Sequence, residues 1–212
     1  MAGTIIADFI RTDASQLSLQ VGNTTFATIN AMGLLSNTGT TIIAANGVIS
    51  GAGTIAKTAL PSGSVLQVVS ANLASFFSTT STIPLDDTIP QITEGAEILT
   101  CAITPTSATS KLYITAVFNT TASIVALSTI ALFQDSTVNA LVSSWGTTSG
   151  GNSPPPAMTI NYSMTSGTTS STTFRVRGGM NSAGTFQING GSGARYLGGS
   201  LISSITITEI AS

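Results

Sequence analysis

The side chains of this sequence that could carry chemistry are few, and most of them are acidic. Asp86 stands beside Asp87, and Glu94 lies three residues before Glu97. Paired carboxylates are the groups that glycosidases use as general acid and general base. The first pair is followed at once by a threonine and, two residues later, a proline, a pattern typical of a solvated turn. We therefore expect a turn here rather than a catalytic pair.

A glycine-rich segment, residues 51–58, nearly spells a phosphate-binding loop. Its sequence, GAGTIAKT, has Ala56 where the motif needs glycine, because the loop backbone must pass close to a phosphate. The motif also requires a helix directly afterwards, and Pro61 leaves no room for one. The segment is predicted to be a glycine-rich connector.

Histidine is absent from the sequence, and cysteine occurs once, at Cys101. A Ser-His-Asp triad and a Cys/His zinc site are thereby excluded, as is an internal disulfide. A lone cysteine usually behaves as a small buried hydrophobe. Cys101 alternates with Leu99 and Ile103, so we expect all three on one face of a strand. The sequence predicts no catalytic residue, no cofactor and no metal ligand.

The composition points to an all-β protein. Charged residues make up 7% of the chain, against about one quarter in an ordinary globular protein. Six scattered basic residues and a pI near 4.7 argue against nucleic acid as a partner, since phosphate binding needs clustered Lys and Arg. Thr, Ile, Val and Phe are plentiful, and these residues suit a half-buried pleated surface.

Alternating patterns locate several strands. Residues 172–177 are predicted to place Phe174 and Val176 inward, and residues 185–189 place Phe186 and Ile188 on one face. Residues 112–134 carry no charge and are long enough to cross a membrane. Their alternation and the polar residues at 119–121 favour two strands joined by a turn instead, so no membrane span is expected. Strands separated by turn signals predict a β-sandwich or jelly roll.

Three segments with different roles follow from the spacing of these patterns. Residues 1–58 contain short extended pieces, such as the alternating Leu17, Leu19 and Val21, which bury little by themselves. Residues 59–64 include Pro61 and Gly63 and are predicted to be a linker. Residues 65–212 have longer strands and are predicted to form the sandwich.

Three residues are candidates for contact with a partner. Trp145 opens a predicted exposed loop at 145–156, and Arg195 and Tyr196 lie in a glycine-rich loop at 190–199. Trp, Tyr and Arg are favoured anchors of interfaces, and binding residues favour loops on a rigid scaffold. The alternative for Trp145 is a strand residue packed in the core, and the same alternative holds for Tyr162.

Four segments within residues 103–210 resemble virion fibre proteins of tailed bacteriophages. They are ITPTSATSKLYI at 103–114, LFQDST at 132–137, GTTSSTTFRV at 167–176 and SITITEI at 204–210. Residues 3–8 and 17–35 are similar to the virion-attachment ends of such proteins. Gln134 departs from the pattern, in which Arg often precedes Asp-Ser.

The resemblance implies a homotrimer located on the virion, in a tail or head fibre. Residues 1–58 would dock on other virion proteins, and a β-sandwich head would touch a glycan or protein of the host cell surface. Two alternatives remain open, a capsid decoration protein and a small glycan-cleaving tail enzyme. A pilus or adhesin subunit is disfavoured, because the N-terminus has no secretory signal.

Overall fold

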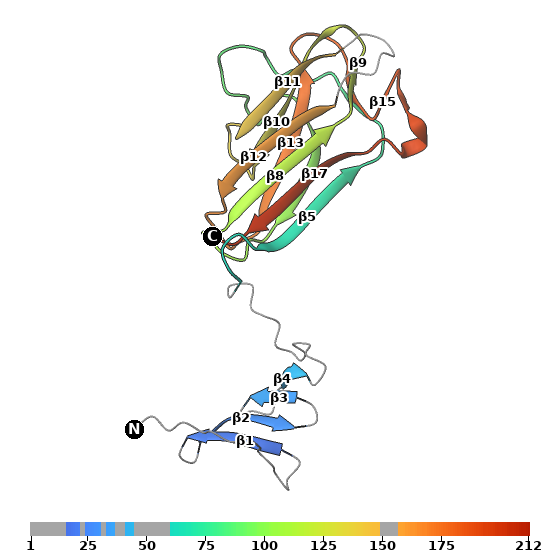
Figure 1. The fold of residues 1–212 in the computed structure, drawn as a ribbon. Coiled ribbons are helices and arrows are strands. Elements are labelled where there is room, and N and C mark those ends of the chain that lie inside the picture. Colours follow the sequence, from blue (N-terminus) through green and yellow to red (C-terminus); the bar gives the residue numbers. More distant parts are fainter. Residues whose placement is uncertain (1–15, 22–23, 31–32, 37–40, 45–59, 149–156) are drawn as a thin grey trace. The chain divides into compact units, whose positions relative to one another are not determined.

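The structure is a computed structural model that describes residues 16–21, 24–30, 33–36, 41–44, 60–148 and 157–212. The chain divides into two compact units, residues 1–59 and residues 60–212 (Figure 1). The glycine-rich segment 51–58 lies outside the described residues. Each unit is described separately below.

The N-terminal unit contains a meander of four antiparallel strands, in the sheet order β1-β2-β3-β4. The strands are β1 Gln16–Val21, β2 Thr24–Asn30, β3 Gly33–Ser36 and β4 Thr41–Ala44. Leu17 pairs with Ile29, and the register shifts once within the β1–β2 pair. The strand predicted from Leu17, Leu19 and Val21 is confirmed.

The C-terminal unit is built on two four-stranded antiparallel sheets (Figure 1). The first has the order β12-β8-β17-β5, with β12 Met158–Thr165, β8 Lys111–Phe118, β17 Ser203–Ile210 and β5 Val65–Leu73. The second has the order β11-β10-β13-β7, with β11 Val142–Thr148, β10 Ala126–Gln134, β13 Thr172–Met180 and β7 Ala96–Ile103.

The pairing of these eight strands is nested. The outermost pair is β5 with β17, followed inward along the chain by β7 with β13, β8 with β12 and β10 with β11. Such a double-stranded ribbon, wrapped so that its strands divide between two facing sheets, is a jelly roll. The predicted all-β fold with a β-sandwich or jelly-roll head is confirmed.

The core lies between the two sheets and follows the predicted alternation. On β8 the buried residues are Leu112, Ile114, Ala116 and Phe118, and on β13 Phe174 and Val176 are fully buried. Cys101 on β7 is buried as expected, and burial raises the pKa of its thiol. The thiol is therefore protonated at neutral pH and packs as a small apolar group.

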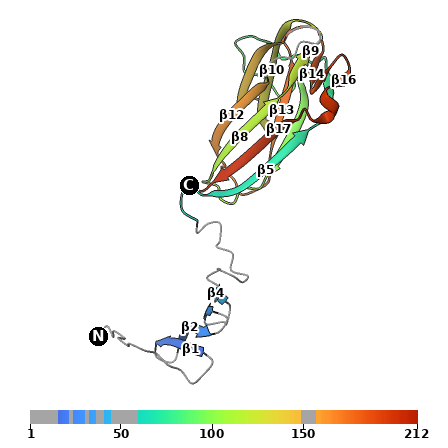
Figure 2. The same cartoon turned by 45° about the vertical axis from the view of Figure 1, so that its right-hand side comes forward.

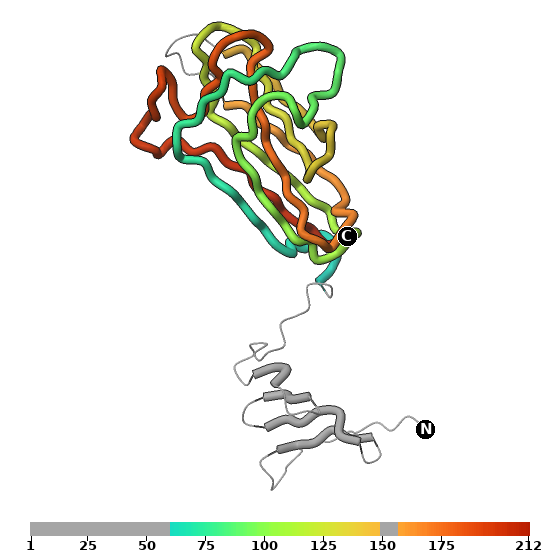
Figure 3. The backbone as a smooth tube through the Cα atoms, turned by 180° about the vertical axis from the view of Figure 1, so that it is seen from behind, coloured from blue at the N-terminus to red at the C-terminus, as the bar shows by residue number. Residues whose placement is uncertain are grey.

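A loop covers part of the outer face of the second sheet. Ile83, from the segment before β7, packs on Ala131 and Phe133 of β10. Figure 3 shows this sheet from behind, with the segment crossing it in green. The crossing is close at Gly179, where an added Cβ would lie 2.5 Å from the carbonyl oxygen of Ser81. Glycine at this position lets the loop seal a second small core.

Short strands complete one end of the sandwich (Figure 2). A three-stranded sheet has the order β6-β14-β9, and a small hairpin pairs β15 with β16. The bounds are β6 Phe77–Thr79, β14 Phe186–Ile188, β9 Thr120–Ala122, β15 Gly190–Gly191 and β16 Ala194–Arg195, followed by the 3-10 turn η2 Leu197–Gly199. Phe186 and Ile188, which were predicted to share one face of a strand, are both fully buried, and Gln187 between them is buried too.

Residues 112–134 form most of β8 and all of β9 and β10, so the prediction of strands instead of a membrane helix is confirmed. The prediction of two strands joined by a turn at 119–121 is wrong, because Thr120 and Thr121 belong to a third strand, β9. Within the described residues, the structure contains no helix with the length and apolar character needed to cross a bilayer.

Candidate functional site

Trp145 lies in a strand and not in a loop. It is in the middle of β11, directly opposite Thr129 of β10. The loop predicted for residues 145–156 is therefore wrong for residues 145–148, which continue the ladder along the edge of the sheet; residues 149–156 lie outside the described residues. The alternative of a core tryptophan is also wrong, because 62% of Trp145 is exposed. Tyr162 does pack against the core from β12.

The loop predicted for residues 190–199 is also corrected, because it contains the β15–β16 hairpin and the turn η2. Arg195 is an exposed residue of β16, and Tyr196 follows it and is half-buried. The Arg195 guanidinium packs against Gly199, and the Tyr196 hydroxyl packs against Gly191. The short hairpin can hold these long side chains close to its own backbone because glycines leave the space.

The three candidate contact residues therefore come from two places. Arg195 and Tyr196 share the hairpin, whereas Trp145 is on the edge strand of the second sheet. Strand β9 contacts both β11 and β15 and lies between the two places.

The acidic pairs have structural partners. The Asp86 carboxylate accepts hydrogen bonds from the backbone N–H of Thr88 at 2.9 Å and from its hydroxyl at 2.5 Å. The Thr88 hydroxyl and N–H lower the pKa of Asp86, because both stabilise its charged form. This is the solvated turn that the sequence predicted.

The second acidic pair does not converge on a shared site. The Glu94 carboxylate accepts a hydrogen bond from the backbone N–H of Gln91 at 2.9 Å. Glu97 forms an ion pair with Arg175 at 3.2 Å on the surface of the sandwich. Among the described residues, no three His, Cys, Asp or Glu side chains are grouped as metal ligands would be.

Asp135 closes the turn after β10 onto β13. Its carboxylate accepts hydrogen bonds at 2.8 Å from the Thr172 hydroxyl and from the backbone N–H of Thr173. Its own carbonyl oxygen accepts a hydrogen bond from Nε of Arg175 at 2.9 Å. Asp135 has a φ of +50°, a conformation that Asp tolerates better than most side chains do. The contacts lock the β10–β11 turn to the adjacent strand.

Glu209 organises the end of the sandwich where β17 finishes and the β7–β8 loop lies, and the sequence patterns gave no sign of it. This carboxylate is fully buried near the end of β17. It accepts hydrogen bonds from Gln67 Nε2 at 2.6 Å, the backbone N–H of Thr106 at 2.7 Å and the Ser110 hydroxyl at 2.6 Å. A weaker one comes from the backbone N–H of Ser107 at 3.3 Å. One side chain thus joins β5, β17 and the β7–β8 loop.

Two opposing effects act on the pKa of Glu209. Burial raises it, because the charged form loses its water. The hydrogen bonds from Ser110, Gln67, Thr106 and Ser107 lower it and together outweigh burial, so the pKa lies below its ordinary value. Glu209 is therefore ionised at neutral pH, and its donors, which also include the Thr106 hydroxyl at 3.1 Å, hold a buried negative charge.

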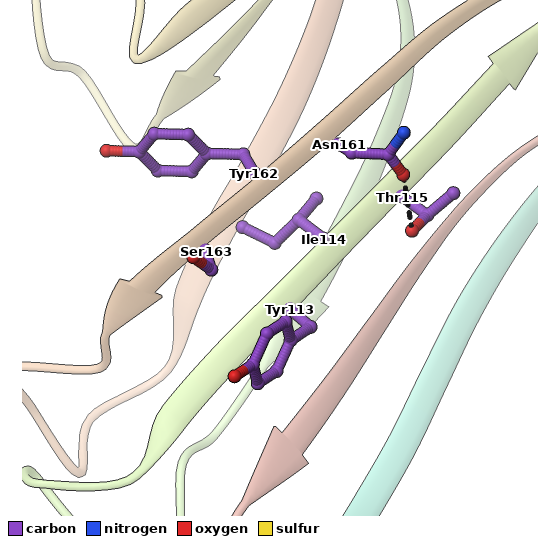
Figure 4. A pocket seen from close by; sticks show the side chains of 6 residues that line it. All are labelled: Tyr113, Ile114, Thr115, Asn161, Tyr162 and Ser163. Atoms are coloured by element: carbon purple, nitrogen blue, oxygen red, sulfur yellow. Dashed lines mark hydrogen bonds between the residues drawn. The ribbon is translucent and has the colours of Figure 1, made fainter.

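A shallow groove of about 210 Å³ lies on the first sheet between β8 and β12. Figure 4 shows Tyr113, Thr115, Asn161 and Ser163 around it, with the Thr115 hydroxyl donating to the Asn161 side-chain oxygen at 3.2 Å. Tyr113 is 52% exposed. The outward residues of the neighbouring β17 are likewise hydroxyls, at Ser204, Thr206 and Thr208. This sheet face is therefore polar and almost uncharged, with Lys111 at its end.

A second cavity, of about 250 Å³, lies where the edge strands of the two sheets meet. Strands β11 and β12 contact each other there, and β9 forms the floor with Thr120. Trp145 lines this cavity, and Arg195 and Tyr196 do not. The sequence singled out Trp145 but not Thr120, because a threonine inside an uncharged strand carries no signal of its own.

The chain matches no protein-family model, and no curated protein matches it significantly. Solved structures that resemble it include Eiger TNF from S. frugiperda, with a TM-score of 0.37 and 10% identity over 68% of this chain and 92% of that one. The infectious bursal disease virus VP2 subviral particle has a TM-score of 0.30 and 14% identity over 88% of this chain and 47% of that one. A structure of the Gx strain of infectious bursal disease virus has a TM-score of 0.27 and 17% identity over 69% of this chain and 37% of that one. These likenesses are too distant to assign a function.

Proposed function

We propose that this chain is a non-enzymatic fibre subunit of a bacteriophage virion. It forms a homotrimer, docks on the particle through residues 1–58, and presents the jelly roll to the host surface. The observation that carries the proposal concerns the segments that resemble phage fibre proteins. These segments supply Glu209 and three residues that donate hydrogen bonds to it, Thr106, Ser107 and Ser110. They also supply Asp135 and the two residues that donate hydrogen bonds to its carboxylate, Thr172 and Thr173. The resemblance thus covers the side chains that fix this jelly roll.

The arrangement of the carboxylates supports a binding role over a catalytic one. Asp86 and Glu94 cap turns, Glu97 pairs with Arg175, and Asp135 and Glu209 hold loops. A glycosidase needs two carboxyl groups on opposite sides of one sugar, about 5 to 10 Å apart and free to exchange protons. Each of these five carboxylates instead holds a local structural contact.

The trimer is supported by the surface of the first sheet. Its outward side chains on β8, β12 and β17 are mostly Thr, Ser, Asn and Tyr, and on β5 Val68 is 57% exposed. A surface with so few charges offers little repulsion between copies.

We expect the purified protein to have a mass three times the 21.3 kDa of the chain at micromolar concentration, measured by light scattering. Because the contacting surfaces carry few charges, 1 M NaCl should leave this mass unchanged, since salt weakens interactions between exposed charges. A stable monomer under either condition contradicts the trimer.

Electron microscopy of particles labelled with an antibody against residues 65–212 tests the location. The fibre role predicts label at a distance from the particle surface, and deletion of residues 1–58 should abolish labelling while the protein is still made. Label flush with the shell would instead identify a capsid decoration protein.

A further inference from the structure

The cavity beside Trp145 has the composition of a small ligand site. Its described lining is wholly uncharged and combines one indole ring with several hydroxyl groups. At about 250 Å³ it is below the roughly 300–1,000 Å³ of drug-sized pockets, which suits a ligand of one ring. The residues that matter for the argument are Thr120, Ser144, Trp145, Thr147, Met158 and Thr159.

Two observations, independent of each other, indicate that this cavity is built to be filled. Thr120 is only 2% exposed, yet its hydroxyl has no hydrogen-bond partner among the described residues. Buried polar groups without a partner are rare, because each costs the free energy of its lost hydration. Trp145, the single tryptophan of the chain, is 62% exposed and lines the same cavity. An indole left in water is a favourable anchor for a ligand with an apolar face.

We propose that this cavity binds one uncharged sugar residue of a surface glycan. A pyranose ring has an apolar C–H face, which packs on the Trp145 indole, and hydroxyls around its rim. One of these rim hydroxyls pairs with the Thr120 hydroxyl, and others reach Ser144 and Thr159. A sugar with a carboxylate is disfavoured, because its charge would lose water without meeting a cation in this lining.

Two other surface grooves give weaker evidence for a ligand site. In the groove between β8 and β12, the Thr115 and Asn161 side chains already pair with each other. In the groove beside Asp86 and Asp87, the Asp86 carboxylate is already engaged by Thr88. Neither groove has a buried hydroxyl without a partner.

The single tryptophan makes a direct test possible with the full-length protein. Methyl glycosides of glucose, galactose, mannose, fucose and N-acetylglucosamine are titrated while Trp145 fluorescence is recorded, and saturation-transfer NMR monitors the same mixtures. We expect a saturable change for at least one neutral sugar at millimolar concentration, and none for glucuronic or sialic acid methyl glycosides. No response to any neutral sugar by either method overturns the proposal, and so does equal binding of the acidic sugars.

A pair of matched variants assigns the hydroxyl. Thr120→Val keeps the shape and the fluorescent reporter but removes the hydroxyl, and we expect it to weaken sugar binding about tenfold. Thr206→Val removes a hydroxyl from the outer face of the first sheet, which does not line the cavity, and should leave binding within about twofold. Equal affinity of Thr120→Val and the wild type overturns the assignment.

This inference rests on the proposed attachment role, but the two can fail separately. Sugar binding is measured on isolated protein, whereas the fibre role is judged by mass and by location on particles. A trimer on the virion that binds no sugar would leave the fibre role intact and remove only the sugar site.

Discussion

Replacing Glu209 with alanine should lower the free energy of unfolding by about 3–4 kcal/mol at pH 7. The change leaves Gln67 Nε2, the N–H of Thr106 and the Ser110 hydroxyl buried or half-buried without their shared acceptor. It also removes the only side chain that joins β17 to the β7–β8 loop in the described hydrogen-bond network. Urea denaturation monitored by circular dichroism measures the effect.

The matched control is Glu97→Ala. Glu97 is also a strand glutamate, but it is exposed and has one surface ion pair with Arg175. Its loss should cost less than about 1 kcal/mol, because exposed pairs contribute little. Equal effects of the two changes would mean that burial and hydrogen bonding of Glu209 do not stabilise the fold.

The same carboxylate gives the protein a defined response to acid. Because the folded-state pKa of Glu209 lies below its ordinary value of 4.5, the stabilisation is complete above that value and is lost as the pH falls through the folded-state pKa. The difference in unfolding free energy between wild type and Glu209→Ala should therefore shrink on acidification below about pH 4.5. A difference that stays constant to pH 2 contradicts this assignment.

Replacing Gly179 with alanine should destabilise the jelly roll by about 2–4 kcal/mol. The new methyl group would meet the Ser81 carbonyl oxygen at 2.5 Å and the Ile83 backbone nitrogen at 3.2 Å. Both are backbone atoms, so the whole covering loop must move, and Ile83 must leave its contact with Ala131 and Phe133. Thermal unfolding by calorimetry measures the loss.

Gly146→Ala is the control for this change. Gly146 is also a strand glycine of the second sheet, but an added Cβ there would have no atom within 4 Å. It should be neutral or slightly stabilising, since alanine restricts the unfolded chain. If Gly146→Ala were as damaging as Gly179→Ala, the close approach of the loop would not be the cause.

The strands and their buried faces were predictable because alternation is a local property. Ile205 and Ile207 alternate with Thr206 and Thr208, and the structure buries the isoleucines. Glu209 continues the same inward face, yet a glutamate near the end of a strand would be predicted from sequence to be exposed to solvent. Its partner Thr106 is 103 residues away in the sequence, and no local pattern contains such a pairing.

The candidate site was predictable only in part, for a related reason. Trp145 was singled out by its residue type, but its place on an edge strand depends on pairing with β10. The unpartnered hydroxyl of Thr120 depends on what surrounds it after folding, and threonine is common throughout the chain. The residue type alone thus singled out Trp145 as a binding residue, whereas the cavity beside it could be found only in the three-dimensional structure.

The position of β17 constrains the order in which the jelly roll can fold. This strand comes last of the eight in the chain, yet it lies between β8 and β5 inside its sheet. Gln67 and Glu209, which bond across the β5–β17 pair, are 142 positions apart. During synthesis, the edges of β5 and β8 that β17 joins therefore stay unpaired until β17 leaves the ribosome. Closing so long a loop is slow, and unpaired strand edges favour aggregation before the loop closes. We therefore expect folding of this unit to benefit from chaperones.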